Sequence, residues 1–484
     1  MQYSIVDYQS IVDASHSLRF DAEFFRPDYL QVQRRLEDIG SRRLRDFQVN
    51  IRHPKEIKRN YVDNGVLFLR AQNVRPLSID LTSNPVYISE EDAERLKENT
   101  IQYKDILITR SGANAGQCAI YLEDRHAISS SHTFILKSGN LNPFFLTIFF
   151  NSRYGKTLIE RGKYGSSQPE IAPPFLYQIP VPNWGDLQTE IEKFYLRSKE
   201  LTELSKTRYA EAQALLLGEL GLTDWQSKYT LAFTTDYVSM QRAERIDADY
   251  FQPKYDDIIS AIKSYPGGWD TLGNLASLKK CVEVGSKEYL ETGIPFVRVS
   301  NLSPYEITQE KYISEELYTE IMEHQPKQGD ILLSKDATPG IAYYLREVPE
   351  KMIPAGGILR LKSKTDKIGN EYLTLVLNSI LTQEQINRDV GGSVIFHWRP
   401  DQVVGTVIPI LHQEMQAEIE KKVIESFNLR KRAKDLLEHA KRAVEIAIEQ
   451  NEHTAIDWLE SVSETSYSKA HNYLDTRLLV RETG

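Results

Sequence analysis

The sequence predicts two α/β domains of mixed α+β content, joined by two long helices that form an antiparallel coiled-coil spacer. Three observations lead to this fold class. Much of the chain repeats at an offset of about 225 residues, each copy begins with short apolar runs bounded by turn residues, and each copy ends in a long segment without Gly or Pro. Such a period is far too long for a solenoid or propeller. We therefore expect a pseudo-two-fold internal repeat of two similar modules.

Matching landmarks define the repeat along both halves of the chain. The spacings between them drift by only a few residues, so the repeat extends from about residue 3 to Trp458. The matched segments are Arg-Phe-Asp-Ala-Glu-Phe-Phe at 19–25 and Arg-Ile-Asp-Ala-Asp-Tyr-Phe at 245–251, Tyr-Ile-Ser-Glu-Glu at 87–91 and 312–316, Asp-Ile-Leu at 105–107 and 330–332, and Glu-Ile-Glu-Lys at 190–193 and 418–421.

The landmarks divide the chain into five parts. The predicted parts are a first α/β domain at 1–182, a first spacer helix at 183–222, a second α/β domain at 223–410, a second spacer helix at 411–452, and a C-terminal tail at 453–484.

Within each α/β domain, short apolar runs bounded by Gly, Asn and Asp predict buried strands. Helices are expected at 90–99 and 373–390, and the apolar segment 144–150 is expected to lie in the core. The predicted strands are 66–69, 106–109 and 134–137 in the first copy, and 294–297, 331–334 and 358–361 in the second.

The two segments without Gly or Pro run over 186–217 and 411–450. Each has one apolar stripe at helical spacing, and helices of this length span roughly 50–60 Å. Neither is stable alone in water without burying its stripe. The two stripes therefore predict an antiparallel or crossed coiled coil, and the alternative is that each helix packs on its own α/β domain. The stripes are Leu187, Ile191, Phe194, Leu201, Leu204, Ala212 and Leu215, and Met415, Ile419, Val423, Phe427, Ala433, Leu436, Ala440, Val444 and Ala447.

Composition is that of an ordinary globular chain, with 41% hydrophobic and 26% charged residues among 484. Cys118 and Cys281 are lone thiols, so neither a disulfide framework nor a four-ligand zinc site is expected. No apolar stretch approaches the ~20 residues of a membrane span, and no secretory signal precedes the first module. We expect a cytoplasmic protein without a membrane partner. The net charge of −9 is only a weak objection to nucleic-acid binding, because local patches decide it.

Motifs for catalysis or cofactor binding are not found in the sequence. Tyr154-Gly-Lys-Thr157 lacks the preceding Gly of a phosphate-binding loop, and no G-x-G-x-x-G fingerprint occurs. Ala172-Pro-Pro-Phe175 lacks the polar first residue of an adenine-methyltransferase motif, and the His residues have no close metal spacing. His132 after Ser129-Ser-Ser131 is better interpreted as a polar loop than as a nucleophile and base. The chain is therefore expected to be non-catalytic, with no metal or cofactor of its own.

Residues 41–60 are the most basic stretch, with seven Arg or Lys residues against two acidic ones. Such a patch can neutralise phosphates and release counterions, whereas the alternative is a solvated charged loop. The candidate contacts here are Arg43, Arg52, Lys55 and Arg59.

Two Gly-Ser loops occupy matching places in the two copies but carry almost entirely different polar side chains. This divergence is expected if two modules of one fold read two different base sequences, because different side chains select different groove edges. Ordinary drift of surface loops after duplication is the alternative. The candidates are Lys163, Tyr164, Ser166, Ser167 and Gln168 in the first loop, and Ser393, His397 and Arg399 in the second.

A third group of candidates is repeated between the copies. Arg70 and Asn73 return as Arg298 and Asn301, just after a predicted strand. They either contact phosphates in both copies or cap a turn. Arg110 and Lys335, which directly follow the two Asp-Ile-Leu strands, complete the set.

Taken together, these residues resemble the specificity subunits of type I restriction–modification systems. The resemblance covers nearly the whole chain and depends on four doubled features. They are the Asp-Ala-(Glu/Asp)-(Phe/Tyr)-Phe-x-Pro opening, the Asp-Ile-Leu strand with Gly116 or Gly340 about ten residues on, the Gly-Ser loop followed by Ile179-Pro180 or Ile408-Pro409, and the long helix opening with Gln188-Thr-Glu-Ile-Glu or Gln416-Ala-Glu-Ile-Glu. The Pro-Leu-x-x-Gln run that commonly opens this helix is only partly kept.

The resemblance implies a non-catalytic DNA-recognition subunit for phage defence. Each α/β region would be a target-recognition domain that reads one half of a split double-stranded DNA site, and the helices would set the gap. The implied partners are two adenine-N6 methyltransferase subunits and the restriction subunits, which would bring S-adenosylmethionine, ATP and Mg. Alternatives are the recognition subunit of another phage-defence methyltransferase complex, a coiled-coil scaffold without DNA contact, or a fused enzyme whose motifs are unrecognised.

Overall fold

The computed structural model of the protein describes residues 5–6, 8, 11–12, 19, 21–58, 60–165, 167–390 and 396–463. The chain forms two compact units, which we call unit 1 (residues 1–201 and 432–484) and unit 2 (residues 202–431). The division falls within both long helices, α7 (Gly185–Glu219) and α15 (Gln413–Glu449). Each unit therefore contains a segment of both helices.

Unit 1 is built on two sheets of short strands. One sheet has the order β10-β9-β12-β2 and is antiparallel throughout, whereas the other has the order β3-β7-β4-β11-β8 and contains one parallel pair, β4 with β11. Its strands are β1 (Arg42–Arg43), β2 (Asn50–Arg52), β3 (Tyr61–Val62), β4 (Val66–Leu69), β5 (Val74–Arg75), β6 (Ser78–Ile79), β7 (Tyr87–Ile88), β8 (Thr100–Ile101), β9 (Ile106–Thr109), β10 (Cys118–Ile120), β11 (Ala127–Ser129), β12 (Thr133–Lys137) and β13 (Pro180–Val181).

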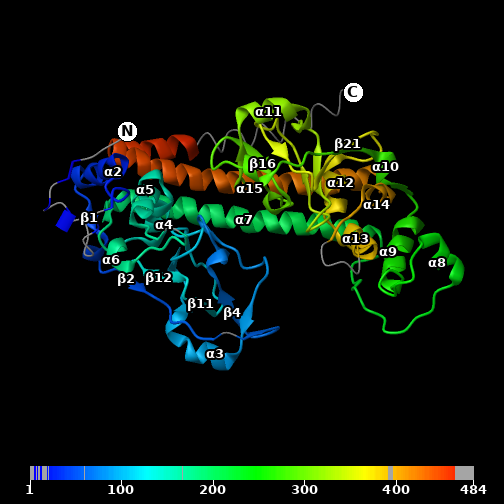
Figure 1. The fold of residues 1–484 in the computed structure, drawn as a ribbon, viewed down its shortest axis with the longest axis horizontal. Coiled ribbons are helices and arrows are strands. Elements are labelled where there is room, and N and C mark those ends of the chain that lie inside the picture. The colour runs from blue at the N-terminus through cyan, green and yellow to red at the C-terminus, as the bar shows by residue number, and fades with distance from the viewer. Residues whose placement is uncertain are drawn as a thin grey trace. The chain divides into compact units, whose positions relative to one another are not determined.

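Helices α4 and α5 share a core with the antiparallel sheet, and α3 packs against the other sheet (Figure 1). The segment 144–150 is helical and buried, as expected, because Asn142 caps its start and every residue from Phe144 to Asn151 is withdrawn from water. The helices are α2 (Pro27–Asp38), α3 (Glu90–Arg95), α4 (Pro143–Asn151), α5 (Arg153–Gly162) and α6 (Pro173–Leu176).

Unit 2 has two corresponding sheets whose matching strands lie in the same order, although its second sheet has three strands where that of unit 1 has five. The antiparallel sheet runs β19-β18-β21-β15, and the second sheet, β17-β16-β20, again contains one parallel pair, β16 with β20. The elements are β14 (Trp269–Thr271), β15 (Ala276–Lys280), β16 (Ile294–Val297), β17 (Tyr312–Ile313), β18 (Ile331–Ser334), β19 (Ala342–Tyr344), β20 (Ile353–Pro354), β21 (Ile358–Ser363), β22 (Val407–Pro409), α8 (Tyr237–Ala243), α9 (Pro253–Ser264), α10 (Leu272–Leu275), α11 (Glu315–Ile321), α12 (Asn370–Leu377), α13 (Ile380–Val390) and α14 (Pro400–Gly405).

The helical stretch expected at 373–390 is two helices, α12 and α13, and the first of them ends at its C-cap residue, Asn378. Its side-chain amide bonds the backbone of Ala342 in β19, with Nδ2 donating to the carbonyl oxygen at 2.8 Å and Oδ1 accepting from the N–H at 2.9 Å. The other predicted helix, at 90–99, is α3 followed by a 3-10 turn, Lys97–Asn99.

The repeated Asp-Ile-Leu signal makes the same turn in both units. Asp105 Oδ2 accepts from the Gln102 N–H, and Asp330 Oδ2 accepts from the Lys327 N–H, each at 2.9 Å. The Gly that follows is required by its backbone, since Gly116 has φ +89° and Gly340 has φ +93°. Both carboxylates are therefore caps of a turn.

Both units bury segments of α7 and α15 in their own cores. In unit 1, Leu187 and Ile191 of α7 share a core with Ala440 and Val444 of α15 and with α4 and α5. In unit 2, Ala212 and Leu216 of α7 share a core with Ile419 and Val423 of α15, together with α12 and α13. Each helical segment thus packs both on the other helix and on the α/β elements of its unit.

Polar contacts between α7 and α15 join residues whose numbers rise along one helix and fall along the other. In unit 1, Ser198 Oγ donates to Ala433 O at 2.7 Å. In unit 2, Ser426 Oγ donates to Ser205 O at 2.7 Å, and Lys422 Nζ contacts Glu211 at 2.8 Å. The segments are therefore antiparallel, with residue numbers falling along α15 as they rise along α7.

The buried face of α7 differs from the predicted stripe. Leu204 is 41% exposed, whereas Ser198, Ser205 and Tyr209 are buried. The buried positions recur every three or four residues, the heptad periodicity, and two of them are Ser rather than apolar residues. A stripe chosen by hydrophobicity misses them because a Ser packs closely when its hydroxyl bonds the facing backbone.

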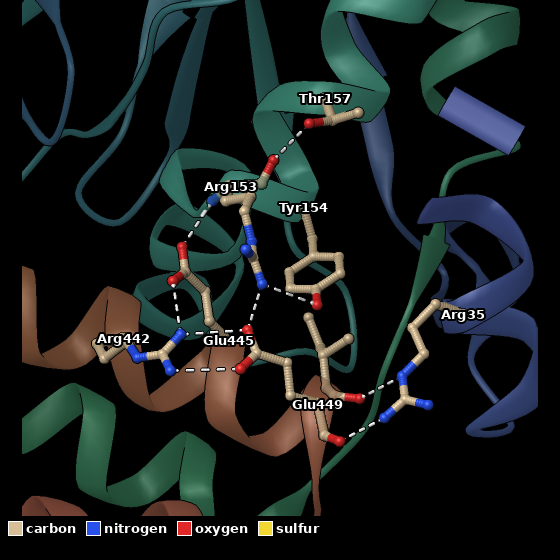
Figure 2. A network of polar contacts seen from close by, with 8 residues as sticks. Arg35, Arg153, Tyr154, Thr157, Arg442, Glu445 and Glu449 are labelled. Atoms are coloured by element: carbon tan, nitrogen blue, oxygen red, sulfur yellow. Dashed lines mark hydrogen bonds and ion pairs between the residues drawn. The ribbon is translucent and has the colours of Figure 1, made fainter. Parts of the chain in front are cut away.

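The C-terminal end of α15 is tied to α2 and α5 of unit 1 by a polar network (Figure 2). Arg35 Nε donates to Ile448 O at 3.0 Å and its Nη2 to Glu449 O, which satisfies carbonyls that a helix end leaves unpaired. Arg442 pairs with Glu445 and Glu449, and Arg153 pairs with Glu449 while its backbone N–H donates to Glu445. A cation at a helix C-terminus is stabilising.

Residues 452–463 are also helical, so the predicted tail, 453–484, begins within a helix, and its part from 464 on lies outside the described residues. Among the helices that the structure describes, none combines the length and apolar character needed to cross a membrane.

Candidate nucleic-acid interface

Two matched surface loops contain most of the candidate residues. In unit 1, the residues after β9 pair with the end of the Gly-Ser loop, where Gly112 N–H donates to Pro169 O and Ile171 N–H to Arg110 O, each at 3.0 Å. In unit 2, Ala337 N–H donates to Phe396 O at 3.0 Å and Trp398 N–H to Lys335 O at 2.8 Å. The same two-bond ladder therefore holds both loops, and it places Ser111 opposite Glu170 and Asp336 opposite His397.

In unit 1 the ladder assembles a cluster around Arg110. Its Nη1 lies 2.8 Å from His53 Nε2, and its Nη2 lies 3.3 Å from Glu170 Oε1. Tyr164 donates from its hydroxyl to the other oxygen of Glu170 at 3.2 Å. Burial, and secondarily the Glu170 charge, raises the pKa of Tyr164, so its hydroxyl stays protonated as a donor.

The loop that projects from this cluster contains the other candidates of unit 1. Lys163 forms an ion pair with Glu160, and its carbonyl accepts from Arg19 at 3.1 Å. Gly165 turns the chain with φ +87°, after which Ser167 and Gln168 are exposed. The exposed residues Ser167 and Gln168 thus follow a segment that Lys163 anchors to other residues of unit 1.

In unit 2 the matched cluster has a different chemistry. Lys335 forms an ion pair with Asp336 Oδ2, and His397 Nδ1 lies 2.9 Å from Asp336 Oδ1. Burial acts to raise the pKa of Asp336, but the hydrogen bonds from Lys335 and His397 outweigh it and leave the pKa below the ordinary value. His397 and Arg399 are both 65% exposed at the side chain, and Arg399 pairs with Asp401 at 3.0 Å.

The basic segment 41–60 uses several of its cations inside unit 1. Arg52 donates to the carbonyls of Glu98 and Thr100 at 2.8 and 3.0 Å and approaches Asp105 at 3.4 Å. Burial raises the pKa of that carboxyl despite the nearby cation. Arg43 donates to Gln178 at 2.6 Å, and Lys55 pairs with Glu98 at 2.5 Å, and both side chains are exposed.

The repeated Arg and Asn residues cap equivalent turns. Asn73 Oδ1 accepts from the Arg70 N–H at 2.9 Å, and Asn301 Oδ1 accepts from the Arg298 N–H at 3.1 Å. The two Asn side chains are only 4% and 2% exposed, and both have the turn-capping arrangement. Of their Arg neighbours, Arg70 donates to Asn84 O and Arg298 to Glu310, both at 2.8 Å.

Three candidates, Arg59, Ser166 and Ser393, lie outside the described residues. Conversely, sequence reasoning missed His53, Glu170 and Asp336, which complete the two clusters. His53 is distant from Arg110 in the sequence, so nothing local marks it. Glu170 and His397 occupy matched positions after the Gly-Ser loops, and only an alignment carried past those loops would have paired them.

No group of three or more His, Cys, Asp or Glu side chains suited to a metal ion occurs in the part of the chain that the structure describes. The arrangement at the two loops offers hydrogen-bond donors and acceptors of several kinds on two similar backbones. Such surfaces are suited to recognising a binding partner through hydrogen bonds.

No protein-family model matches the sequence, and no curated protein sequence matches it. The chain is similar to a crystal structure of a type I restriction–modification S subunit from M. genitalium, with 13% identity, coverage of 87% of this chain and 95% of that chain, and a TM-score of 0.38. It is also similar to a structure concerning complex assembly and conformational transition of a type I R–M system (14% identity, 84% and 96% covered, TM-score 0.27). A third is the HsdS subunit from Thermoanaerobacter tengcongensis (14%, 84% and 95%, TM-score 0.24).

The first two come from type I restriction–modification systems, the systems that the sequence resembles.

Proposed function

We propose that this chain is the DNA-recognition subunit of a type I restriction–modification complex, with each unit reading one half of a bipartite target. One observation carries the proposal: the same backbone ladder at the end of β9 and of β18 presents unlike side chains in the two units. A shared framework with different exposed groups suits two different base sequences, because base edges are distinguished by donor and acceptor patterns.

The presented groups fit this role. Unit 1 offers Gln168, Ser167 and the Tyr164 hydroxyl, and unit 2 offers His397 and Arg399. Gln bonds adenine, Arg bonds guanine, and Ser bonds several bases in the major groove. Arg43 and Lys55, whose side chains are exposed, are the proposed phosphate contacts of unit 1.

The helices α7 and α15 are the proposed spacer of the two recognition units. With 35 and 37 residues, each is roughly 50–55 Å long at 1.5 Å per residue. That length spans about one and a half turns of duplex, a turn being about 34–36 Å. By the resemblance of the sequence, methyltransferase subunits bind this subunit and modify adenine, and restriction subunits join them.

The test is methylation mapping. The chain is co-expressed with the methyltransferase subunit encoded beside it, and N6-methyladenine is located genome-wide. A split motif with a fixed gap supports the proposal. Methylation without a split motif, methylation by this chain alone, or no dependence on this chain contradicts it.

A heptad deletion tests the spacer. Removing residues 199–205 from α7 and 426–432 from α15 together keeps the three- and four-residue spacing of buried positions and the Ser198–Ala433 contact. The helices shorten by about 10 Å, or roughly three base pairs, so the gap should shrink while the bases of both halves stay the same. Deletion from α7 alone breaks the pairing and is the control for loss of folding.

A further inference from the structure

We propose that His397 is a specificity-determining residue of unit 2, that its Nε2 accepts a hydrogen bond from the exocyclic amino group of adenine or cytosine, and that Asp336 positions it. This inference rests on the proposed function and narrows it to one side chain and one class of base edge. It follows from the geometry at the end of β18.

The backbone brings the two side chains to the same face of a short ladder. The bonds Ala337 N–H to Phe396 O and Trp398 N–H to Lys335 O flank Asp336 and His397, which are therefore a non-hydrogen-bonded cross-strand pair. Side chains of such pairs are the closest in antiparallel pairing. The imidazole accordingly reaches the carboxylate at 2.9 Å from Nδ1 to Oδ1.

The charge state of Asp336 decides which ring nitrogen carries hydrogen. Its second oxygen pairs with Lys335, whose side chain is only 17% exposed, and the pKa of Asp336 is lowered. An ionised carboxylate only accepts, so Nδ1 of His397 is the donor in this pair. In the neutral ring Nε2 then has a free lone pair, and the side chain is 65% exposed.

The turn that bears Asp336 is fixed independently of the imidazole. Ser334 Oγ donates to Thr338 O at 2.6 Å and accepts from the Ile341 N–H at 2.8 Å. Ala337 has φ +59°, a left-handed conformation that disfavours side chains other than those of Gly, Asn and Asp. Strained backbone of this kind persists where the surroundings hold it, and it is common at ligand-binding sites.

The matched position in unit 1 holds a carboxylate. Glu170 lies opposite Ser111 in the equivalent bridge, and it accepts from Arg110 and Tyr164 instead of donating to an acid. Because the two ladders are alike, Glu170 in unit 1 and His397 in unit 2 occupy equivalent positions and differ in the chemical group that they present. Two half-sites of different base sequence require such a difference between the side chains of the two units.

The test compares variants by methylation mapping in the complex with the methyltransferase subunit, and the half-site that does not change serves as the folding control. His397→Phe keeps the ring size and removes Nε2, and Asp336→Ala removes the positioning acceptor. Both should reduce discrimination at the same single position of one half-site by about tenfold or more, with the other half-site unchanged. Glu315→Gln, which removes an exposed charge of unit 2 that pairs with Lys351, should leave the motif intact.

Conservative variants separate positioning from folding. Asp336→Asn still accepts from Nδ1, so it should keep the base preference that Asp336→Ala loses. If Asp336→Asn behaves like Asp336→Ala, the positioning role is wrong. Suppose that the wild-type chain gives a split motif. If His397→Phe leaves that motif unchanged, or weakens recognition of both halves equally, the inference about His397 is wrong and the proposed function still stands. Absence of a split motif with the wild-type chain overturns the proposed function as well.

Discussion

Units 1 and 2 have the same backbone arrangement around β9 and β18, but the side chains of the exposed loops that follow differ. In both, a buried Asp caps the turn before the strand, a Gly of positive φ follows it, and a ladder of two bonds fixes the next loop. At the matched loop position unit 1 has Glu170 and unit 2 has His397. The comparison teaches that the repeated residues of this chain are those on which the backbone depends, and that the surface groups vary on top of them.

The largest expected effect comes from the buried residue next to each ladder. Trp398 is 0% exposed and donates from Nε1 to Asp389 at 3.1 Å, whereas the matched Ile171 is 1% exposed and purely apolar. Trp398→Ala should cost about 3–5 kcal/mol of unfolding free energy and Ile171→Ala about 2–5 kcal/mol. Urea unfolding measures the loss, and hydrogen exchange assigns it to one unit.

Trp398→Phe is the control, because it keeps a ring but removes the donor to Asp389, whose pKa burial already raises. It should cost about 1–3 kcal/mol. A larger loss from Ile171→Ala than from Trp398→Ala would contradict the expected difference between the units.

An intermediate effect is expected at the turns capped by Asn73 and Asn301. Replacing either with Ala leaves a backbone N–H without its acceptor and should cost about 1–3 kcal/mol. The loss should be larger for Asn73, whose Nδ2 donates to Asp80 O at 2.9 Å, than for Asn301, whose Nδ2 lies 3.3 Å from Thr308 Oγ1. Arg70→Ala and Arg298→Ala keep the backbone N–H, so smaller losses are expected in urea unfolding. Equal or greater losses would mean that the Arg side chains, and not the caps, stabilise the turns.

The smallest effect concerns acid and distinguishes Asp336 from Ser111 at the matched position. The pKa of Asp336 lies below the ordinary value of 3.8, so the unfolded state binds more protons in acid. Its stabilising contribution is present above that ordinary value and is lost as the pH falls through the folded-state pKa. The difference in melting temperature between wild type and Asp336→Asn should therefore be steady near neutral pH and shrink below about pH 4. Ser111→Ala should show no such pH dependence, and a difference that grows in acid would reverse the assignment.

Local patterns predicted the regular elements well. The strands 66–69, 106–109, 294–297 and 331–334 form with the predicted bounds, and the two long helices are present as α7 and α15. Apolar runs and the absence of Gly and Pro are local properties, so they can be recognised without the fold. The helix face was predicted less well, because the buried Ser198 and Ser205 bond or pack against the facing helix and hydrophobicity does not mark them.

The sequence by itself determined the duplication, the element types and the positions where the two copies differ, because these follow from residue order and spacing. Only the tertiary structure decided which polar side chains are engaged in hydrogen bonds within the protein and which are exposed to a partner. It placed Asn73 and Asn301 inside turns, engaged Arg52 with backbone carbonyls, and joined His53 to Arg110 and Asp336 to His397. A side chain's hydrogen-bond partners come from segments distant along the chain, and no spacing rule within one segment contains them.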